Sequence, residues 1–113
     1  MTVASYARAV TARPGREPLD PAALAVALEG LPGWTVDGSA IVRTYACRDF
    51  RAAIGLIDRI ADAAEAADHH PDLALRRYRR LEVRLTTHDA GGVTGRDLEL
   101  ARSIDVLAAG ATA

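Results

Sequence analysis

The sequence predicts an α+β fold, a two-layer sandwich in which helices cover one face of a four-stranded antiparallel sheet. Three observations predict it. Three segments have the 3.6-residue periodicity of amphipathic helices, two short runs flank an Asp-Gly pair, and a later run alternates with a period of two. The expected order is αββαββα, and its hairpins make the sheet antiparallel.

The first helix is expected at residues 20–29. Asp20 suits the N-cap, Pro21 the first helical position and Gly30 the end. One face carries three leucines at helical spacing: Leu24, Leu28 and Leu31.

Asp37-Gly38 then separates two runs of strand-forming residues. Because both residues tolerate positive φ, this pair is a strong hairpin signal. We expect strands at 34–37 and 40–46.

The longest periodic segment is "RDFRAAIGLIDRIADAAEAADHH", which Pro71 ends because the residue before a proline disfavours helical geometry. The sequence therefore places His69 and His70 at the end of this helix. Its apolar stripe is wide and rich in alanine, which also suits packing against a partner helix. The stripe comprises Phe50, Ile54, Ile57, Ala61 and Ala64, widened by Ala53 and Ile60.

"YRRLEVRLTTH" alternates as a half-buried strand does, and a shorter strand is expected at 73–77. The face expected to be buried holds Leu81, Val83, Leu85 and Thr87. "TGRDLELARSIDVLA" closes the chain as a helix, and Thr94 and Asp97 have the spacing of a capping box. Four residues of that helix are expected to face inward: Leu98, Ala101, Ile104 and Leu107.

The 113 residues suit one domain, with a formal net charge of −1 and a single cysteine. Residues 1–18 carry arginine but no acid before Glu17, and we expect a disordered tail before a domain at 19–113. A transit peptide is the alternative for this segment. No apolar run is long enough to span a membrane, and we expect a cytoplasmic protein.

All three histidines lie between residues 66 and 92, at the ends of two expected elements. The pKa of free histidine, about 6.5, suits it to both acid and base roles near neutral pH. For each histidine alone, a helix cap or a solvated side chain is the simpler interpretation. A zinc site is a rival, but His69 and His70 would diverge by about 100° if both were helical. "RRYRR" suggests nucleic acid, but a strand would divide these charges between two faces, so no nucleic-acid partner is expected.

One pattern resembles a known family. The pattern consists of Glu65, His69-His70-Pro71, Tyr78, His88 and Asp97, separated by three, six, nine and eight residues in that order. It is similar to the signature of the pterin-4a-carbinolamine dehydratases. "LTTHDAGGVTGRDLELARSID" and Gly33-Trp34 resemble the same family, over about residues 20–108.

The resemblance implies dehydration of 4a-hydroxytetrahydrobiopterin, or a related tetrahydropterin, to the quinonoid dihydropterin, with no metal and no organic cofactor. It implies that His69, His70 and His88 are catalytic and leaves their acid and base roles open. It also implies that Asp97 orients His88. The substrate-binding residues implied are Pro71, Thr87, Asp89 and Asp97. The chain departs from the family in lacking a tryptophan after His-His-Pro and in having Arg79 where asparagine is common.

The resemblance further implies a homodimer or homotetramer formed through the long helix and the sheet edge. The alternative function is a non-catalytic dimerisation, assembly or coactivator module of the same fold. A zinc hydrolase is a third class, which metal analysis would separate.

Overall fold

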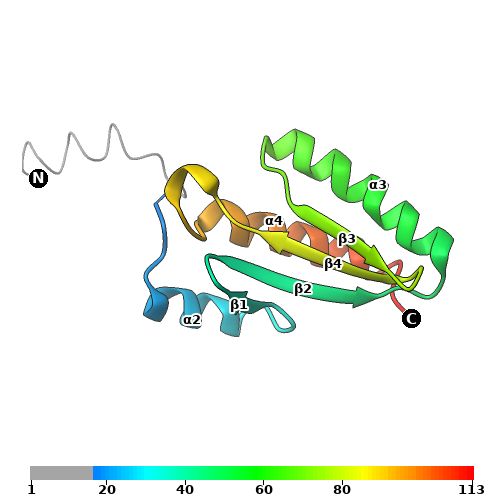
Figure 1. The fold of residues 1–113 in the computed structure, drawn as a ribbon, viewed down its shortest axis with the longest axis horizontal. Helices are drawn as coiled ribbons and strands as arrows, with labels where there is room; N and C mark the ends of the chain where they lie inside the picture. The colour runs from blue at the N-terminus through cyan, green and yellow to red at the C-terminus, as the bar shows by residue number, and fades with distance from the viewer. Residues whose placement is uncertain (1–16) are drawn as a thin grey trace, which may run out of the picture.

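The computed structural model describes residues 17–113 and has the predicted α+β order (Figure 1). The elements are α2 (Pro21–Glu29), β1 (Thr35–Asp37), β2 (Ala40–Ala46), α3 (Phe50–Ala67), β3 (Asp72–Arg76), β4 (Arg80–Leu85), a short 3-10 turn η1 (His88–Ala90) and α4 (Gly95–Ala108). Of the expected tail at 1–18, residues 1–16 lie outside the described part of the chain.

The sheet has the strand order β1-β2-β4-β3, and every pair is antiparallel. The first hairpin is present as predicted, but its turn residues are Gly38 and Ser39: Asp37 pairs with Ala40 at the end of β1, and Gly38 has φ 61°. One face of the sheet is buried under the helices, and the inward side chains of β2 and β4 include Ile41, Tyr45, Leu81, Val83 and Leu85. Figure 1 shows α3 and α4 on the same side of the sheet. This is the two-layer arrangement that the sequence predicts.

The expected stripe of α3 divides between two faces. Its buried residues are Ala52, Ala53, Leu56, Ile60 and Ala64. Phe50 and Ile54 are instead 51% and 39% exposed, and Ala61 is exposed. The helix therefore turns only the Leu56 side of its apolar surface toward the sheet, and the Phe50 side stays at the surface.

The sequence overestimates the length of two elements. α3 ends at Ala67, before the histidine pair, and β4 ends at Leu85, before His88. Since β3 starts opposite Arg84, the chain after β4 runs on past the start of β3. His69 and His70, in the connection after α3, and His88, in η1, thus lie beyond one end of the β3–β4 pair.

The capping predictions at two helix starts are confirmed. The Asp20 carboxylate accepts a hydrogen bond from the Ala23 N–H at 2.8 Å, and Thr94 and Asp97 form a complete capping box. No described helix is long and apolar enough to cross a membrane.

Candidate active site

The end of α3 places His69 and His70. Asp68 adopts the left-handed conformation, with φ 49°, and the His69 N–H donates to the Ala64 carbonyl at 3.0 Å. A left-handed residue commonly ends a helix, although glycine is the usual choice. The prediction that both histidines lie within the helix end is therefore wrong. They lie in the connection that follows, so the argument from helical divergence does not apply to them.

Arg96, the second residue of α4, secures this connection. Its guanidinium donates from Nη2 to the Ala67 carbonyl at 3.2 Å and to the Asp68 carbonyl at 2.7 Å. These carbonyls are at the negative end of α3, where a cation is stabilised. The sequence analysis missed this residue, because nothing in the local pattern indicates that an α4 side chain reaches the end of α3.

His88 is placed by a tight turn between β4 and α4. The Thr87 N–H donates to the Gly92 carbonyl at 3.1 Å, and Gly91, at φ 74°, donates to the His88 carbonyl at 3.1 Å. A positive φ at Gly91 is readily available only to glycine. The turn leaves the His88 side chain exposed.

The two chain segments meet at one pocket of about 230 Å³. It is lined by Asp68, His69, His70, Thr86, Thr87, His88, Asp89 and Arg96. All three histidines, Thr87 and Asp89 therefore lie together, as expected. Pro71 does not line the pocket, because the chain there already leads into β3.

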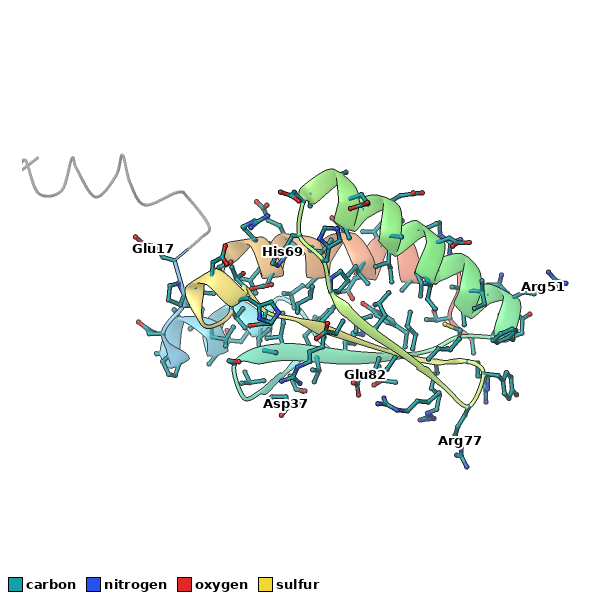
Figure 2. The ribbon with its side chains drawn as sticks, turned by 45° about the horizontal axis from the view of Figure 1, so that its top comes forward. Glu17, Asp37, Arg51, His69, Arg77 and Glu82 are labelled. Atoms are coloured by element: carbon teal, nitrogen blue, oxygen red, sulfur yellow. The ribbon has the colours of Figure 1, made fainter. Side chains whose placement is uncertain are left out.

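A buried network holds His69. The His69 Nε2 lies 2.5 Å from Oδ1 of Asp97, and the exposed fractions of the two residues are 7% and 0%. The other carboxylate oxygen of Asp97 accepts from the Thr87 hydroxyl and the Thr94 N–H, both at 2.8 Å. Figure 2 shows His69 directed inward from the start of the connection to β3.

This network corrects two expectations for Asp97. Asp97 orients His69 and not His88, and the Asp97 side chain is too deeply buried to touch a substrate. The capping box explains both results, because it fixes Asp97 at the N-terminus of α4, where the carboxylate reaches His69.

The hydrogen bonds also indicate which nitrogen of His69 carries the proton. Both Thr87 and Thr94 donate to the Asp97 carboxylate, so its remaining oxygen accepts from Nε2–H of His69. In the neutral ring, Nδ1 then has the free lone pair. A base oriented by a buried carboxylate is the arrangement found in catalytic triads.

His70 and His88 differ from His69 in burial. The His70 Nε2 lies 2.6 Å from Oε2 of Glu65, and both side chains are mostly exposed. The His88 side chain makes no hydrogen bond or ion pair with the rest of 17–113. The site thus combines one fixed imidazole with two accessible ones. In the described part of the chain, no group of three or more His, Cys, Asp or Glu side chains is placed to hold a metal ion.

Comparison with known proteins identifies the family. The sequence model described as "Pterin 4 alpha carbinolamine dehydratase" matches residues 17–107. The chain belongs to this family.

Several members are similar over most of their length. A Thermomicrobium roseum protein is 49% identical over 90 residues, which are 80% of this chain and 96% of that protein. A Nocardia farcinica protein is 54% identical over 85 residues, 75% of this chain and 88% of the other. Both are named provisionally as pterin-4-alpha-carbinolamine dehydratases.

Two solved structures have a similar fold. A transcriptional coactivator/pterin dehydratase from Brucella melitensis is 38% identical, with a TM-score of 0.77 over 81% of this chain and 99% of that one. A pterin dehydratase-like protein, described as a RuBisCO assembly factor of the alpha-carboxysome, is 16% identical with a TM-score of 0.54 over 66% and 86% of the two chains. The second match shows the shared fold alone.

Proposed function

We propose that this pterin-4a-carbinolamine dehydratase family member dehydrates 4a-hydroxytetrahydrobiopterin or a related 4a-hydroxytetrahydropterin. The observation that carries the proposal is the convergence of three histidines on one pocket, with His69 held by the buried Asp97 carboxylate. Membership of the family supports the substrate class.

The reaction needs one acid and one base. The C4a–O bond breaks as an acid gives a proton to the departing hydroxyl, which leaves as water. A base takes the proton from N5, and the electron pair of the N5–H bond forms the C4a=N5 double bond of the quinonoid product. One proton is given and one is taken, so transfer between the histidines or through solvent restores the enzyme. General acid and base groups typically contribute 10²–10⁴-fold each.

The surroundings of the histidines favour a division of roles. Nδ1 of His69 is the free acceptor of a ring held in one orientation, so we assign it the N5 proton. His70 lines the same pocket, and the 2.6 Å contact of its Nε2 with Glu65 holds its ring in place there. We therefore assign His70 the protonation of the leaving hydroxyl. His88 and Asp89, which line the pocket from the turn between β4 and α4, are assigned to binding the pterin.

No step in this mechanism needs a metal or an organic cofactor. Asp97 acts as a positioning residue through His69, and Thr87 and Thr94 position Asp97 in turn. Each of these polar groups has a hydrogen-bonded partner, as buried polar groups require.

We also propose that the chain forms a homo-oligomer through α3. Phe50 and Ile54 remain exposed on this helix, next to a groove of about 420 Å³. Arg51 and Asp58 line the same groove, so an antiparallel packing of two α3 helices centred on it sets Arg51 of one copy opposite Asp58 of the other. A second copy of the chain is therefore the occupant that both the apolar residues and the charges fit.

The exposed face of α3 is also the observation that favours the alternative, a non-catalytic assembly or coactivator module. Decay of a 4a-carbinolamine, followed by its ultraviolet absorbance, separates the two functions. The dehydratase accelerates the decay, whereas a module that only binds leaves the spontaneous rate unchanged.

A further inference from the structure

The basic stretch "RRYRR" forms the tip of the β3–β4 hairpin. Arg76 ends β3, Arg80 begins β4, and residues 77–79 make the turn between them. Arg76 and Arg80 are direct cross-strand partners, so both side chains lie on the sheet face that the helices do not cover. A single strand would have divided these charges between two faces, and a hairpin turn does not. The reason for which no nucleic-acid partner was expected therefore does not hold.

The charges and the backbone of this tip are locally unfavourable. Arg76 and Arg80 place like charges directly opposite one another on neighbouring strands, which is destabilising. Arg77 and Tyr78 both have positive φ, 50° and 58°, where large side chains are rare and Asn-Gly is the favoured pair. Asp68 is the remaining non-glycine residue with positive φ in 17–113, and it lines the histidine pocket. Because such conformations cluster at functional sites, the hairpin tip is a candidate for a second one.

One further arginine joins the tip from the end of β2. The Cys47 N–H donates to the Arg79 carbonyl at 2.8 Å, and Arg79 Nη1 donates to the Cys47 carbonyl at 3.3 Å, so Arg48 lies beside the turn. Figure 2 shows Arg77 directed away from the sheet at this end of the molecule. The basic tip is the surface formed by Arg48, Arg76, Arg77, Arg79 and Arg80 around Tyr78.

Acidic side chains compensate little of the charge of the basic tip. Oε2 of Glu82 lies 3.3 Å from Nη1 of Arg76, but the two side chains are 39% and 62% exposed, so water screens the pair. The Asp49 carboxylate is occupied as the N-cap of α3. Within 17–113, Arg77 and Arg80 form no ion pair and no side-chain hydrogen bond. The basic tip is therefore a positive surface on a chain whose net charge is −1.

Tyr78 gives the basic tip a flat apolar surface. The residue is 61% exposed, and the Arg79 guanidinium lies 6.0 Å from the centre of its ring. A guanidinium pairs with a phosphate through parallel N–H donors, and an exposed aromatic ring stacks on a nucleobase. An acidic peptide would satisfy the charges but would leave the ring without a partner. The combination therefore favours single-stranded nucleic acid, whose bases are free to stack.

We propose that the basic tip binds single-stranded nucleic acid, with Tyr78 stacked on a base and with Arg77 and Arg80 paired with the flanking phosphates. Phosphate pairing and stacking read no base edge, so the binding is independent of sequence. The histidine pocket lies beyond the other end of the β3–β4 pair, which leaves the pocket open when a strand is bound. The proposal does not rest on the proposed dehydratase function.

Fluorescence anisotropy of a labelled oligothymidylate, titrated with the full chain, tests the binding. For a single strand each phosphate contact contributes about 0.7 to the slope of log Kd against log salt, so about two to four contacts predict a slope of about 1.4–2.8. Absence of saturable binding at low salt, or a slope near zero, overturns the proposal.

Two arginine variants separate phosphate contacts from general charge. Arg77→Gln and Arg80→Gln each remove one contact and are expected to lower the slope by about 0.7. Arg102→Gln makes the same change at an exposed arginine of α4 and is expected to leave the slope and the affinity unchanged. Arg80→Gln also removes a like-charge pair, so its melting temperature is not expected to fall. If Arg102→Gln lowers the slope as much as the other two changes, or if none of them lowers it, the site is wrong.

Tyr78→Asn tests the stacked base. Asparagine tolerates positive φ better than tyrosine does, so the turn is expected to keep its fold. Loss of one stacked base should weaken binding by at least about five-fold while the salt slope stays the same. Tyr78→Phe keeps the ring and is expected to retain the wild-type affinity. Wild-type affinity in Tyr78→Asn overturns the role of the ring.

Competition distinguishes the class of ligand. Thymidine monophosphate, poly-glutamate and vesicles that contain phosphatidylserine are each added at the same concentration of negative charge as the oligothymidylate. None is expected to displace it. Displacement by the mononucleotide assigns the site to free nucleotides, displacement by poly-glutamate assigns it to an acidic protein, and displacement by vesicles assigns it to a membrane. Each of these results overturns the proposal.

A variant of the histidine pocket tests where the strand binds. His88→Ala removes an exposed side chain that lines the pocket at the other end of the β3–β4 pair. It is expected to bind the oligothymidylate with the wild-type affinity. Weaker binding in His88→Ala, together with unchanged binding in Arg77→Gln, would place the strand in the histidine pocket and contradict the proposal.

Discussion

The Nε2 atom of His69 lies 2.5 Å from Oδ1 of Asp97, although 28 residues separate them. The pair joins the chain after α3 to the first turn of α4, and both residues are buried. Asp97 thereby serves as a helix cap and as the group that orients an imidazole. Removing its charge is expected to affect folding and chemistry together.

Asp97→Asn is expected to lower kcat by roughly 10²–10⁴-fold, because the amide no longer fixes the protonated nitrogen of His69. It also weakens the hydrogen bonds from Thr87 and Thr94, which should reduce the free energy of unfolding by about 1–3 kcal/mol. Glu99→Gln, an exposed change on the same helix, is the control for both measurements. A kcat equal to that of the control contradicts the positioning role.

His69→Ala is expected to reduce kcat/KM by about 10²–10⁴-fold, or about 2.7–5.5 kcal/mol of transition-state stabilisation, whereas His88→Ala is expected chiefly to raise KM, because His88 is assigned to binding. Their stabilities should differ. His69→Ala leaves the buried Asp97 carboxylate without one of its donors and should destabilise the fold by about 1–3 kcal/mol. His88 is exposed, so His88→Ala should unfold at the same urea concentration as the wild type. Equal destabilisation by the two changes disagrees with the observed network.

The sequence predicts those parts of the fold that depend on local signals. Asp37-Gly38 and the Thr94–Asp97 capping box act through neighbouring backbone groups, so the residue pattern was sufficient to find them. The rotation of α3 is different. Phe50 and Leu56 both belong to apolar stripes, and only packing against the sheet selects the Leu56 side.

The sequence predicted which histidines form the site but not which side chains they contact. The spacing and the family resemblance indicated the three histidines, which do share one pocket. The partner of Asp97 could not be predicted, because the choice between His69 and His88 depends on how α4 packs against the end of α3. Arg96 was missed for the same reason, since its partners are backbone carbonyls distant in the sequence.

A second, partly buried cluster predicts how stability depends on pH. Tyr45 donates its hydroxyl hydrogen to Asp105, which also accepts from Trp34 Nε1 at 3.0 Å and Arg43 Nη1 at 2.9 Å. Burial, followed by the hydrogen bond to Asp105, raises the pKa of Tyr45 well above its ordinary value of 10. Burial likewise raises the pKa of Cys47 above its ordinary value of 9.

Each raised pKa stabilises the fold fully below the ordinary value and loses that contribution as pH climbs above it, because the unfolded chain releases the proton first. The free energy of unfolding is expected to fall above about pH 9 for the thiol and to fall more steeply above about pH 10, by at most about 1.4 kcal/mol per pH unit for each group. Urea titrations between pH 8 and 11 measure this loss. Tyr45→Phe should flatten it above pH 10, and an unchanged slope in that variant contradicts the assignment.

The exposed side of α3 predicts self-association. Ile54→Glu places a charge in the proposed helix interface and is expected to lower the mass measured by light scattering toward smaller multiples of the 12.0 kDa chain. Val26→Glu, at an exposed apolar position on α2, is the matched control and should leave the mass unchanged. A wild-type chain that is monomeric at micromolar concentration rules out this interface. The interface is also ruled out if Val26→Glu lowers the mass and Ile54→Glu does not.

The most direct test of the central claim is the rate at which the purified wild-type protein removes the 4a-hydroxyl from a carbinolamine generated in situ, measured with and without a chelator. Acid and base catalysis by histidine predicts a rate well above the spontaneous loss, and the chelator should leave it unchanged. A rate equal to the spontaneous loss, or an acceleration that chelation abolishes, contradicts the account.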